Sequence, residues 1–166
     1  MGDTLQLKAY AKINLGLDVV GKREDGYHEV RMIMQTVKLF DKLTMRVLDE
    51  DEIRIRTNLN FLAVDENNLV YRAVKLVKDT YHIEKGMDID LFKVIPVAAG
   101  MAGGSTDCAS ALFGAARLYG LHLSKKELME LGVRLGADVP YCVMRGTALS
   151  EGIGEILTPL SPMPHC

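Results

Sequence analysis

The sequence predicts an α+β fold, and three observations carry this prediction. Apolar and polar residues alternate along residues 5–19, which is the period of a half-buried β-strand. Other segments repeat apolar residues at helical spacing. The strand patterns come in runs, without the strict strand–helix–strand alternation of a parallel sheet. A chain of 166 residues, 48% of them hydrophobic, is long enough to bury one core.

Strands are predicted to dominate the first third of the chain. After the first strand, a turn with glycine at both ends (residues 21–26) leads to an apolar-rich run at residues 30–39. Shorter alternating runs follow at residues 43–47 and 53–55. Turns are expected at residues 40–42 and in the acidic run 49–52, so these strands form an antiparallel meander.

The middle of the chain reads as a helix followed by a strand. Asn67 and Asn68 offer N-cap side chains to a helix whose apolar stripe runs from Val70 to Tyr81. Gly86 marks its end, and residues 89–94 form the next strand.

The last third is predicted to hold two helices and two short strands. One helix ends at Gly120, and a capping box at residues 124–127 begins the other, which ends at Gly136. Residues 141–144 and 147–150 are expected as strands, with a hairpin turn at residues 152–155. We place the domain at residues 1–158 and a Pro-containing tail, typical of a linker, at residues 159–166.

A glycine-rich stretch joins a predicted strand to a predicted helix. Residues 96–107 read Pro-Val-Ala-Ala-Gly-Met-Ala-Gly-Gly-Ser-Thr-Asp. Small side chains let backbone amides approach a ligand, and the first amides of a helix lack internal partners, so the pattern predicts an anion site, most often for phosphate. The alternative is an ordinary tight turn with Ser105 or Thr106 as the N-cap. The spacing matches neither the P-loop nor the dinucleotide fingerprint.

Three further places carry candidate functional side chains. Lys12 and Asn14 share one face of the first strand, where they either line a pocket or are solvated. Asp138 precedes Pro140 at a helix-to-strand break, and a carboxylate there is either a cap or a catalyst. Tyr27 and His28 follow the glycine turn and either stack on and hydrogen-bond a planar ligand or cover the core edge.

Composition excludes several classes of function. The net charge of −2 gives no basic footprint for nucleic acid, and no segment reaches the roughly 18 apolar residues of a membrane span. The odd number of cysteines argues against a disulfide framework or a zinc site, and the histidines lack metal-ligand spacing, so we expect a reduced cytoplasm and no structural metal. The cysteines are Cys108, Cys142 and Cys166, and the histidines are His28, His82, His122 and His165.

Together these landmarks resemble the GHMP small-molecule kinases. Residues 9–15 (Ala-Tyr-Ala-Lys-Ile-Asn-Leu) resemble the family's N-terminal motif, and residues 96–107 its phosphate-binding motif. Residues 25–29 (Asp-Gly-Tyr-His-Glu) and 136–140 (Gly-Ala-Asp-Val-Pro) are narrower and resemble the cytidine-binding branch. The resemblance implies an antiparallel or mixed sheet with helices packed on one side, the N-terminal domain of these kinases (ribosomal protein S5 domain 2-like).

The resemblance also implies an activity. It is ATP-dependent phosphorylation of the 2-hydroxyl of a cytidine diphosphate-linked methylerythritol, in the non-mevalonate isoprenoid pathway, with ATP and Mg²⁺ as cofactors. Asp138 would be the general base and Lys12 its electrostatic partner. Tyr27 would stack on cytosine, His28 would hydrogen-bond the base, and Asn14 would hold the substrate.

The resemblance further implies the nucleotide site. Ser105 is the nearest candidate hydroxyl for Mg²⁺, and no carboxylate stands out as a dedicated metal ligand. The residues that would bind the nucleotide are Asn68, Leu69, Lys93, Pro96, Ala99, Gly100, Met101, Ala102, Gly103, Gly104, Ser105 and Thr106.

Some features depart from the family pattern. Ala98, Ala99 and Ala102 replace glycine, which is tolerable if these residues keep φ negative, and Asp107 replaces asparagine, so we expect its carboxylate to point away from the phosphate. Family members continue for about another domain, so we expect either that the chain is truncated or that the missing half was never present. Half a cleft is expected to bind weakly, and the apolar surface that the other half would cover suggests a homodimer. Two alternatives remain: another GHMP kinase, or a non-catalytic nucleotide-binding module.

Overall fold

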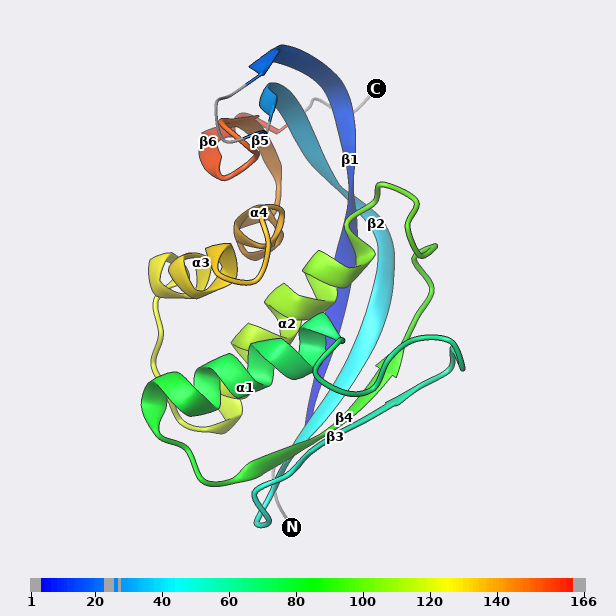
Figure 1. The fold of residues 1–166 in the computed structure, drawn as a ribbon, viewed down its shortest axis with the longest axis vertical. Coiled ribbons are helices and arrows are strands. Elements are labelled where there is room, and N and C mark those ends of the chain that lie inside the picture. Colours follow the sequence, from blue (N-terminus) through cyan, green and yellow to red (C-terminus); the bar gives the residue numbers. More distant parts are fainter. Residues whose placement is uncertain (1–3, 23–25, 27, 163–166) are drawn as a thin grey trace.

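A mixed β-sheet with four helices on one side forms the fold, within the residues that the structure describes, 4–22, 26 and 28–162 (Figure 1). The structure is a computed structural model. Its strands are β1 (Thr4–Lys22), β2 (His28–Leu48), β3 (Ile53–Thr57), β4 (Gly86–Phe92), β5 (Thr147–Glu151) and β6 (Ile156–Leu160). Its helices are α1 (Leu69–Tyr81), α2 (Gly103–Leu118), α3 (Lys125–Val133) and α4 (Val139–Met144). The predicted α+β class is confirmed.

The long strand β2 organises the sheet. The strand order is β3-β4-β2-β5-β6, and β1 pairs with β2 along its other edge. All pairs are antiparallel except β3 with β4, which is parallel, so the sheet is mixed. One end of β2 pairs with β4 and the other with β5, which brings the start of the glycine-rich segment and the C-terminal hairpin to one sheet.

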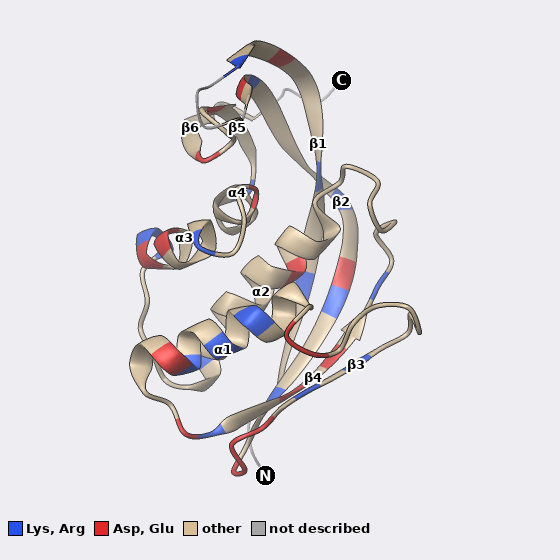
Figure 2. Ribbon diagram, viewed as in Figure 1, with Lys and Arg blue, Asp and Glu red and all other residues tan. Residues whose placement is uncertain are grey.

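The predicted turn at residues 40–42 is wrong, because β2 runs without a break through this point. Asp41 is fully buried, and its carboxylate is satisfied by protein groups instead of by water. A polar residue in an apolar strand run therefore marks a buried contact here and not a loop. The acidic turn at residues 49–52 is confirmed between β2 and β3, where the ribbon in Figure 2 is red for acidic residues.

Two helix starts follow the predicted cap chemistry. The Asn68 side chain accepts the amide of Val70 at 2.8 Å, which begins α1. Ser124 and Glu127 form a full capping box at the start of α3.

The C-terminal part differs from the prediction in two places. Residues 141–144 belong to the helix α4 and not to a strand, because Pro140 lies in the first turn, where its missing N–H costs nothing. Tyr141 is buried and its hydroxyl donates to the Gly146 carbonyl at 2.7 Å. Strand β6 continues through Leu160, two residues past the predicted end of the domain, and the hairpin turn before it is confirmed.

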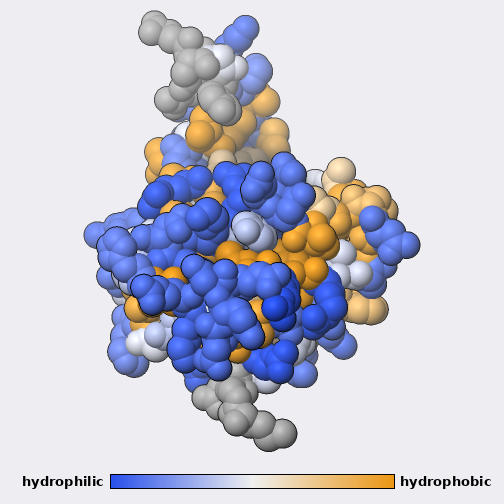
Figure 3. Space-filling view, turned by 60° about the horizontal axis from the view of Figure 1, so that its bottom comes forward, coloured by the Kyte–Doolittle hydropathy of each residue, from blue (hydrophilic) through white to orange (hydrophobic). Residues whose placement is uncertain are grey.

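The core lies between the sheet and the helices. It contains fully buried side chains from β2, β4, α1 and α2, among them Met34, Leu43, Met45, Ile89, Val74 and Leu112. Hydrophilic side chains cover most of the face shown in Figure 3, with apolar side chains visible between them. Among the helices of the described residues, none is long and apolar enough to cross a membrane.

The start of β4 yields a test of the fold. A Cβ at Gly86 would lie 2.1 Å from the Glu52 carbonyl oxygen and 2.3 Å from that of Glu50, both of them backbone atoms. Because backbone cannot rotate away, we expect Gly86→Ala to lower the free energy of unfolding by about 3 kcal/mol or more. Gly16→Ala, where nothing lies within 4 Å, is the matched control. Urea denaturation of both variants measures the difference, and equal midpoints would contradict the packing described.

Candidate active site

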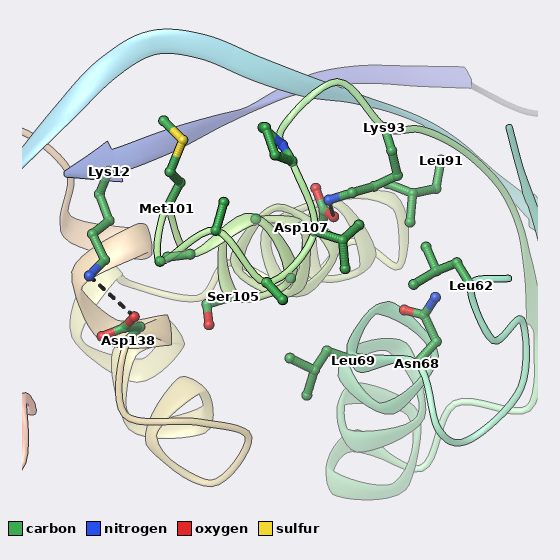
Figure 4. A pocket seen from close by; sticks show the side chains of 18 of the residues that line it. Lys12, Leu62, Asn68, Leu69, Leu91, Lys93, Met101, Ser105, Asp107 and Asp138 are labelled. Carbon is green, nitrogen blue, oxygen red and sulfur yellow. Dashed lines mark hydrogen bonds and ion pairs between the residues drawn. The ribbon is translucent and has the colours of Figure 1, made fainter. Parts of the chain in front are cut away.

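A cavity of about 520 Å³ lies where β1, α1, α2 and the start of α4 converge on the glycine-rich segment (Figure 4). It brings together residues that are far apart in the sequence, from Lys12 to Asp138. The predicted site residues that line it are Lys12, Asn14, Asn68, Leu69, Lys93, Pro96, Ala99, Gly100, Met101, Ala102, Gly103, Gly104, Ser105 and Asp138.

Lys12 and Asp138 form an ion pair at one end of the cavity. Lys12 Nζ lies 3.6 Å from Asp138 Oδ2 and donates to Asn14 Oδ1 at 3.0 Å. Lys12 is buried, so it is not a solvated strand lysine. Asp138 occupies the N-cap position of α4, yet its side chain makes no capping hydrogen bond and is one-third exposed toward the cavity. Its carboxylate is therefore available to a ligand.

A backbone hydrogen bond ties the glycine-rich segment to the strand that carries Lys12. The amide of Lys12 donates to the Met101 carbonyl at 3.1 Å. This bond forms where the register between β1 and β2 shifts, between Tyr10 and Lys12. The shift releases a strand amide from the sheet ladder, so that the amide can hold the loop beside the ion pair.

The helix α2 opens into the cavity with free amides. It begins at Gly103, and its N-cap is Ala102, which forms no side-chain cap, so the predicted N-cap at Ser105 or Thr106 is wrong. The first amide inside the helical ladder is that of Thr106, which donates to the Ala102 carbonyl at 2.9 Å. The amides of Gly103, Gly104 and Ser105 precede it and have no intrahelical partner. With the helix dipole, they make an anion site.

Two alanines in this segment have a strained backbone. Ala98 has φ of 59° and Ala102 has φ of 56°, so the expectation that the alanines keep φ negative is wrong for these two. An L-residue in this region costs about 1–2 kcal/mol. The strain aims the chain into α2, and little room is left for a side chain at Gly103, because a Cβ there would lie 3.2 Å from both Lys93 Nζ and an Ile95 methyl.

Two of the predicted residues that the structure describes, Thr106 and His28, do not line the cavity. Thr106 is buried in α2 with its amide used inside the helix and does not line the cavity, so its contact with a phosphate stays a prediction. His28 is exposed at the start of β2 and is not part of the cavity wall, so its role stays a prediction. Tyr27 lies outside the described residues.

Buried charges anchor the segment to the sheet. Lys93 Nζ donates to Asp41 Oδ2 at 2.5 Å and to Asp107 Oδ2 at 2.6 Å, and all three side chains are almost fully buried. The other oxygen of Asp41 accepts the amides of Val94 and Ile95 at 2.5 and 2.8 Å. Sequence reasoning missed Asp41. The one available signal was a single carboxylate inside an apolar strand run.

The buried trio sets the charge near the anion site. Burial raises the pKa of Asp107 to about 8, the positive charge of Lys93 opposes this, and the negative charge of Asp41 adds to it. Burial by itself lowers the pKa of Lys93, but Asp107 and Asp41 together raise it. Asp107 is therefore largely protonated at neutral pH, which leaves one ammonium paired with one carboxylate and removes a repulsion that a phosphate would meet. Asp107 lines the cavity and contacts Lys93, so its expected orientation away from a phosphate stays a prediction.

Two nucleotide-site candidates use their polar atoms internally. The Lys93 ammonium is held by the two carboxylates, and the Asn68 amide caps α1 while donating to the Ala63 carbonyl at 2.7 Å. Both residues therefore shape the cavity, while other lining residues provide the polar contacts with a ligand. Figure 4 shows the Ser105 hydroxyl pointing into the cavity between Asp138 and Leu69. Among the described residues, no cluster of three or more His, Cys, Asp or Glu suits a metal ion.

The protonation of Asp107 yields a pH prediction. Its pKa rises from 3.8 to about 8 on folding, so between these values the native state binds more protons than the unfolded chain and loses stability as pH rises. Asp107→Asn removes this dependence while keeping the shape. We expect the Tm of the variant minus that of the unaltered chain to increase from pH 5 to about pH 8 and then to level off. Calorimetric scans across this range measure the difference, and parallel curves would refute the protonation.

Comparisons with known proteins agree with this geometry. Residues 68–146 match the GHMP kinases N terminal domain family. The chain is 62% identical over 164 residues to the 4-diphosphocytidyl-2-C-methyl-D-erythritol kinase of Lachnospira eligens and 63% identical over 164 residues to that of Lachnoclostridium phytofermentans. These alignments cover 99% of this chain and 57% and 56% of the relatives, so the chain spans a little over half their length.

Solved structures give the same fold. A crystal structure of 4-(cytidine 5'-diphospho)-2C-methyl-D-erythritol kinase matches with a TM-score of 0.82 and 35% identity over 95% of this chain and 55% of that one. The homoserine kinase of Cytophaga hutchinsonii shares the fold, with a TM-score of 0.71 and 22% identity over 90% of this chain and 49% of that one. The chain belongs to the GHMP kinases and has the fold of their N-terminal domain.

Proposed function

We propose that this chain is the nucleotide-binding part of an enzyme that transfers a phosphoryl group from ATP to the 2-hydroxyl of 4-diphosphocytidyl-2-C-methyl-D-erythritol. The observation that carries the proposal is the Lys12–Asp138 pair, 3.6 Å apart, in the same cavity as the free amides of α2. A base and an anion site in one cavity are what phosphoryl transfer to an alcohol requires. The names of the relatives support the choice of substrate.

The amides at the start of α2 bind the phosphates of ATP in this proposal. Gly103, Gly104 and Ser105 offer donors at the positive end of the helix, and Leu69 offers an apolar contact to the nucleoside. The Ser105 hydroxyl points into the same space, so it fits as a ligand of a Mg²⁺ ion that arrives with the nucleotide. Such an ion, when bound, neutralises phosphate charge. We propose no dedicated carboxylate ligand for it.

Asp138 takes the proton of the attacking hydroxyl. Its carboxylate is free of capping bonds and reaches the cavity, and the ammonium of Lys12 lies 3.6 Å from it. Lys12 also stabilises negative charge on the transferred group, and its contact with Asn14 fixes its position. Asn14 lines the same end of the cavity and is proposed to hold the acceptor.

Recognition of the cytidine is assigned to Tyr27 and His28 on the basis of the sequence motif at residues 25–29. Stacking by an aromatic ring and hydrogen bonding by an imidazole suit a planar base. A cytoplasmic enzyme without membrane or nucleic-acid partners fits this small-molecule substrate. The homodimer stays a prediction.

Nucleotide binding by the chain tests the anion site. A Cβ at Gly103 would press on Lys93 Nζ and an Ile95 methyl at 3.2 Å, which displaces the first amide of α2. We expect Gly103→Ala to raise the Kd for ATP roughly tenfold, about the contribution of one hydrogen bond to a charged group, and to change adenosine binding less. Gly136→Ala, whose Cβ would make only an ordinary contact at 3.6 Å, is the control. Calorimetric titration measures both ligands, and an unchanged ATP affinity would remove α2 from the site.

Turnover tests the base. Because the chain spans 57% of the Lachnospira eligens relative, we would join residues 1–160, through the end of β6, to the remaining part of that relative and follow ADP release with ATP, Mg²⁺ and the cytidyl substrate. We expect Asp138→Asn to slow turnover by about 10²–10⁴-fold while ATP still binds. Asp79→Asn, an exposed carboxylate paired with Lys75 on α1, is the control. Undiminished turnover of the Asp138 variant excludes this residue as the base. A chimera that binds ATP but phosphorylates only another alcohol would instead favour a different GHMP kinase.

A further inference from the structure

A second cavity, of about 680 Å³, lies beside the body of α2 and shares no lining residue with the candidate active site. Its walls come from β1, α2, α3 and α4, and the stretch before α3 adds Leu123. Cavities of this volume are within the range that binds small molecules. Nothing in the proposed phosphoryl transfer uses this cavity, so its chemistry is open to a separate assignment.

The charge of the second cavity has one sign. Lys8, Lys125 and Arg145 line it, and among its described lining residues there is no aspartate or glutamate. The chain as a whole has more acidic than basic residues and a net charge of −2, so this bias is a local feature. A concave surface with cations and no carboxylates favours an anion.

Two of the three cations are positioned by hydrogen bonds beside the cavity, and the ammonium of the third, Lys8, lies 4.7 Å from the centre of the Phe40 ring, outside the cavity lining. Lys125 Nζ donates to the Met144 carbonyl at 2.7 Å, and Arg145 Nη2 donates to the Lys8 carbonyl at 3.2 Å. The Arg145 guanidinium also lies 5.3 Å from the centre of the Tyr10 ring. Each of these cations retains N–H donors that no carboxylate occupies. The charges therefore stand at defined places on the rim.

The walls between these cations are apolar. Leu7 and Leu128 are wholly or partly buried, and Phe113 is 42% exposed although it lies on a helix that is otherwise deeply buried. Cys142 adds a buried thiol, which stays neutral because burial raises its pKa to about 12. Apolar walls of this kind suit a hydrocarbon or aromatic body.

One polar group on the wall has no partner in the fold. Ser110 is 4% exposed, and its Oγ forms no hydrogen bond in the described part of the structure. Buried hydroxyls are almost always hydrogen-bonded, because an unsatisfied one costs about 1–3 kcal/mol. Ser110 lines the second cavity, so a buried hydroxyl without a partner lies in the cavity wall.

We propose that the second cavity binds an amphipathic organic anion, with an apolar body and one phosphate, sulfonate or carboxylate head. The body lies against Leu7, Phe113 and Leu128, and the head lies near Lys125 and Arg145. The assignment rests on the one-signed charge, the apolar walls and the unpartnered hydroxyl together, and it does not depend on the proposed kinase activity. An apolar cavity without the cations would accept neutral compounds equally well, which makes the charge the property to test.

A pair of fluorescent probes separates the contribution of the cations to binding from that of the apolar walls. Anilinonaphthalene sulfonate has an aromatic body and an anionic head, and phenylnaphthylamine has the same body without the head. We expect the double variant Lys125→Gln/Arg145→Gln to raise the Kd of the sulfonate about tenfold, the effect of losing charged contacts, and to leave phenylnaphthylamine unchanged. Lys126→Gln is the matched control, because Lys126 neighbours Lys125 on α3 but lies outside the cavity and is exposed.

Amide chemical shifts locate the bound probe. We expect the sulfonate to shift residues 6–10, 109–113 and 142–145 and to leave residues 98–105 in place. Phe113→Ala should weaken both probes. The proposal would be overturned if the double variant lost the same affinity for both probes. It would also be overturned if the amide chemical shift changes were centred on residues 98–105. ATP titration of the double variant should give the Kd of the unaltered chain, so a failure here is distinct from a failure of the kinase proposal.

Discussion

The position of the candidate active site depends on the buried carboxylate of Asp41. One of its oxygens binds the amides of Val94 and Ile95, and the other binds Lys93, which in turn binds Asp107 on α2. A buried charge is tolerated only where its partners hold it in a fixed geometry, so these contacts fix the relative positions of the groups that they join. They place the start of the glycine-rich segment and the start of α2 against the middle of the longest strand. The anion site is rigid because its supports are buried charges.

A second tether completes the site from the other side. The hydrogen bond from the Lys12 amide to the Met101 carbonyl joins the segment to β1, at the register shift that frees this amide. The segment is thus held at its two ends through the buried side chains and in its middle, at Met101, through the backbone. Ala98 and Ala102, with their positive φ values, lie between these anchors. Positional precision at an active site comes from such over-determined geometry.

The two cavities use the same three elements in different ways. β1, α2 and α4 contribute Lys12, Ser105 and Asp138 to the first cavity and Tyr10, Ser110 and Arg145 to the neighbourhood of the second. In the first, a carboxylate accompanies the cation, which suits proton transfer. In the second, the cations have no carboxylate beside them, which suits binding of an anion alone. The chemistry of each cavity follows from its charges more than from its shape.

The sequence by itself determined the features that arise from local chemistry. The alternation of β1, the Asn68 cap, the capping box at Ser124 and the glycine-rich helix start all depend on residues within a few positions of one another. The motif around Lys12 and Asp138 also identified both residues, although their proximity was only implied by resemblance. For this reason, local propensity and turn chemistry can be predicted from a single sequence.

Tertiary structure decided what depends on distant partners. Whether residue 41 lies in a turn or a strand is set by Lys93 and two amides more than 50 positions away. The same holds for residues 141–144, which are helical where Tyr141 packs into the core, and for Lys93, whose ammonium is used inside the protein. The second cavity joins residues 6–10 with residues 142–145 and leaves no pattern in either segment. Burial and pairing of polar groups are properties of the folded chain, because they are defined by what surrounds a residue and not by its neighbours in sequence.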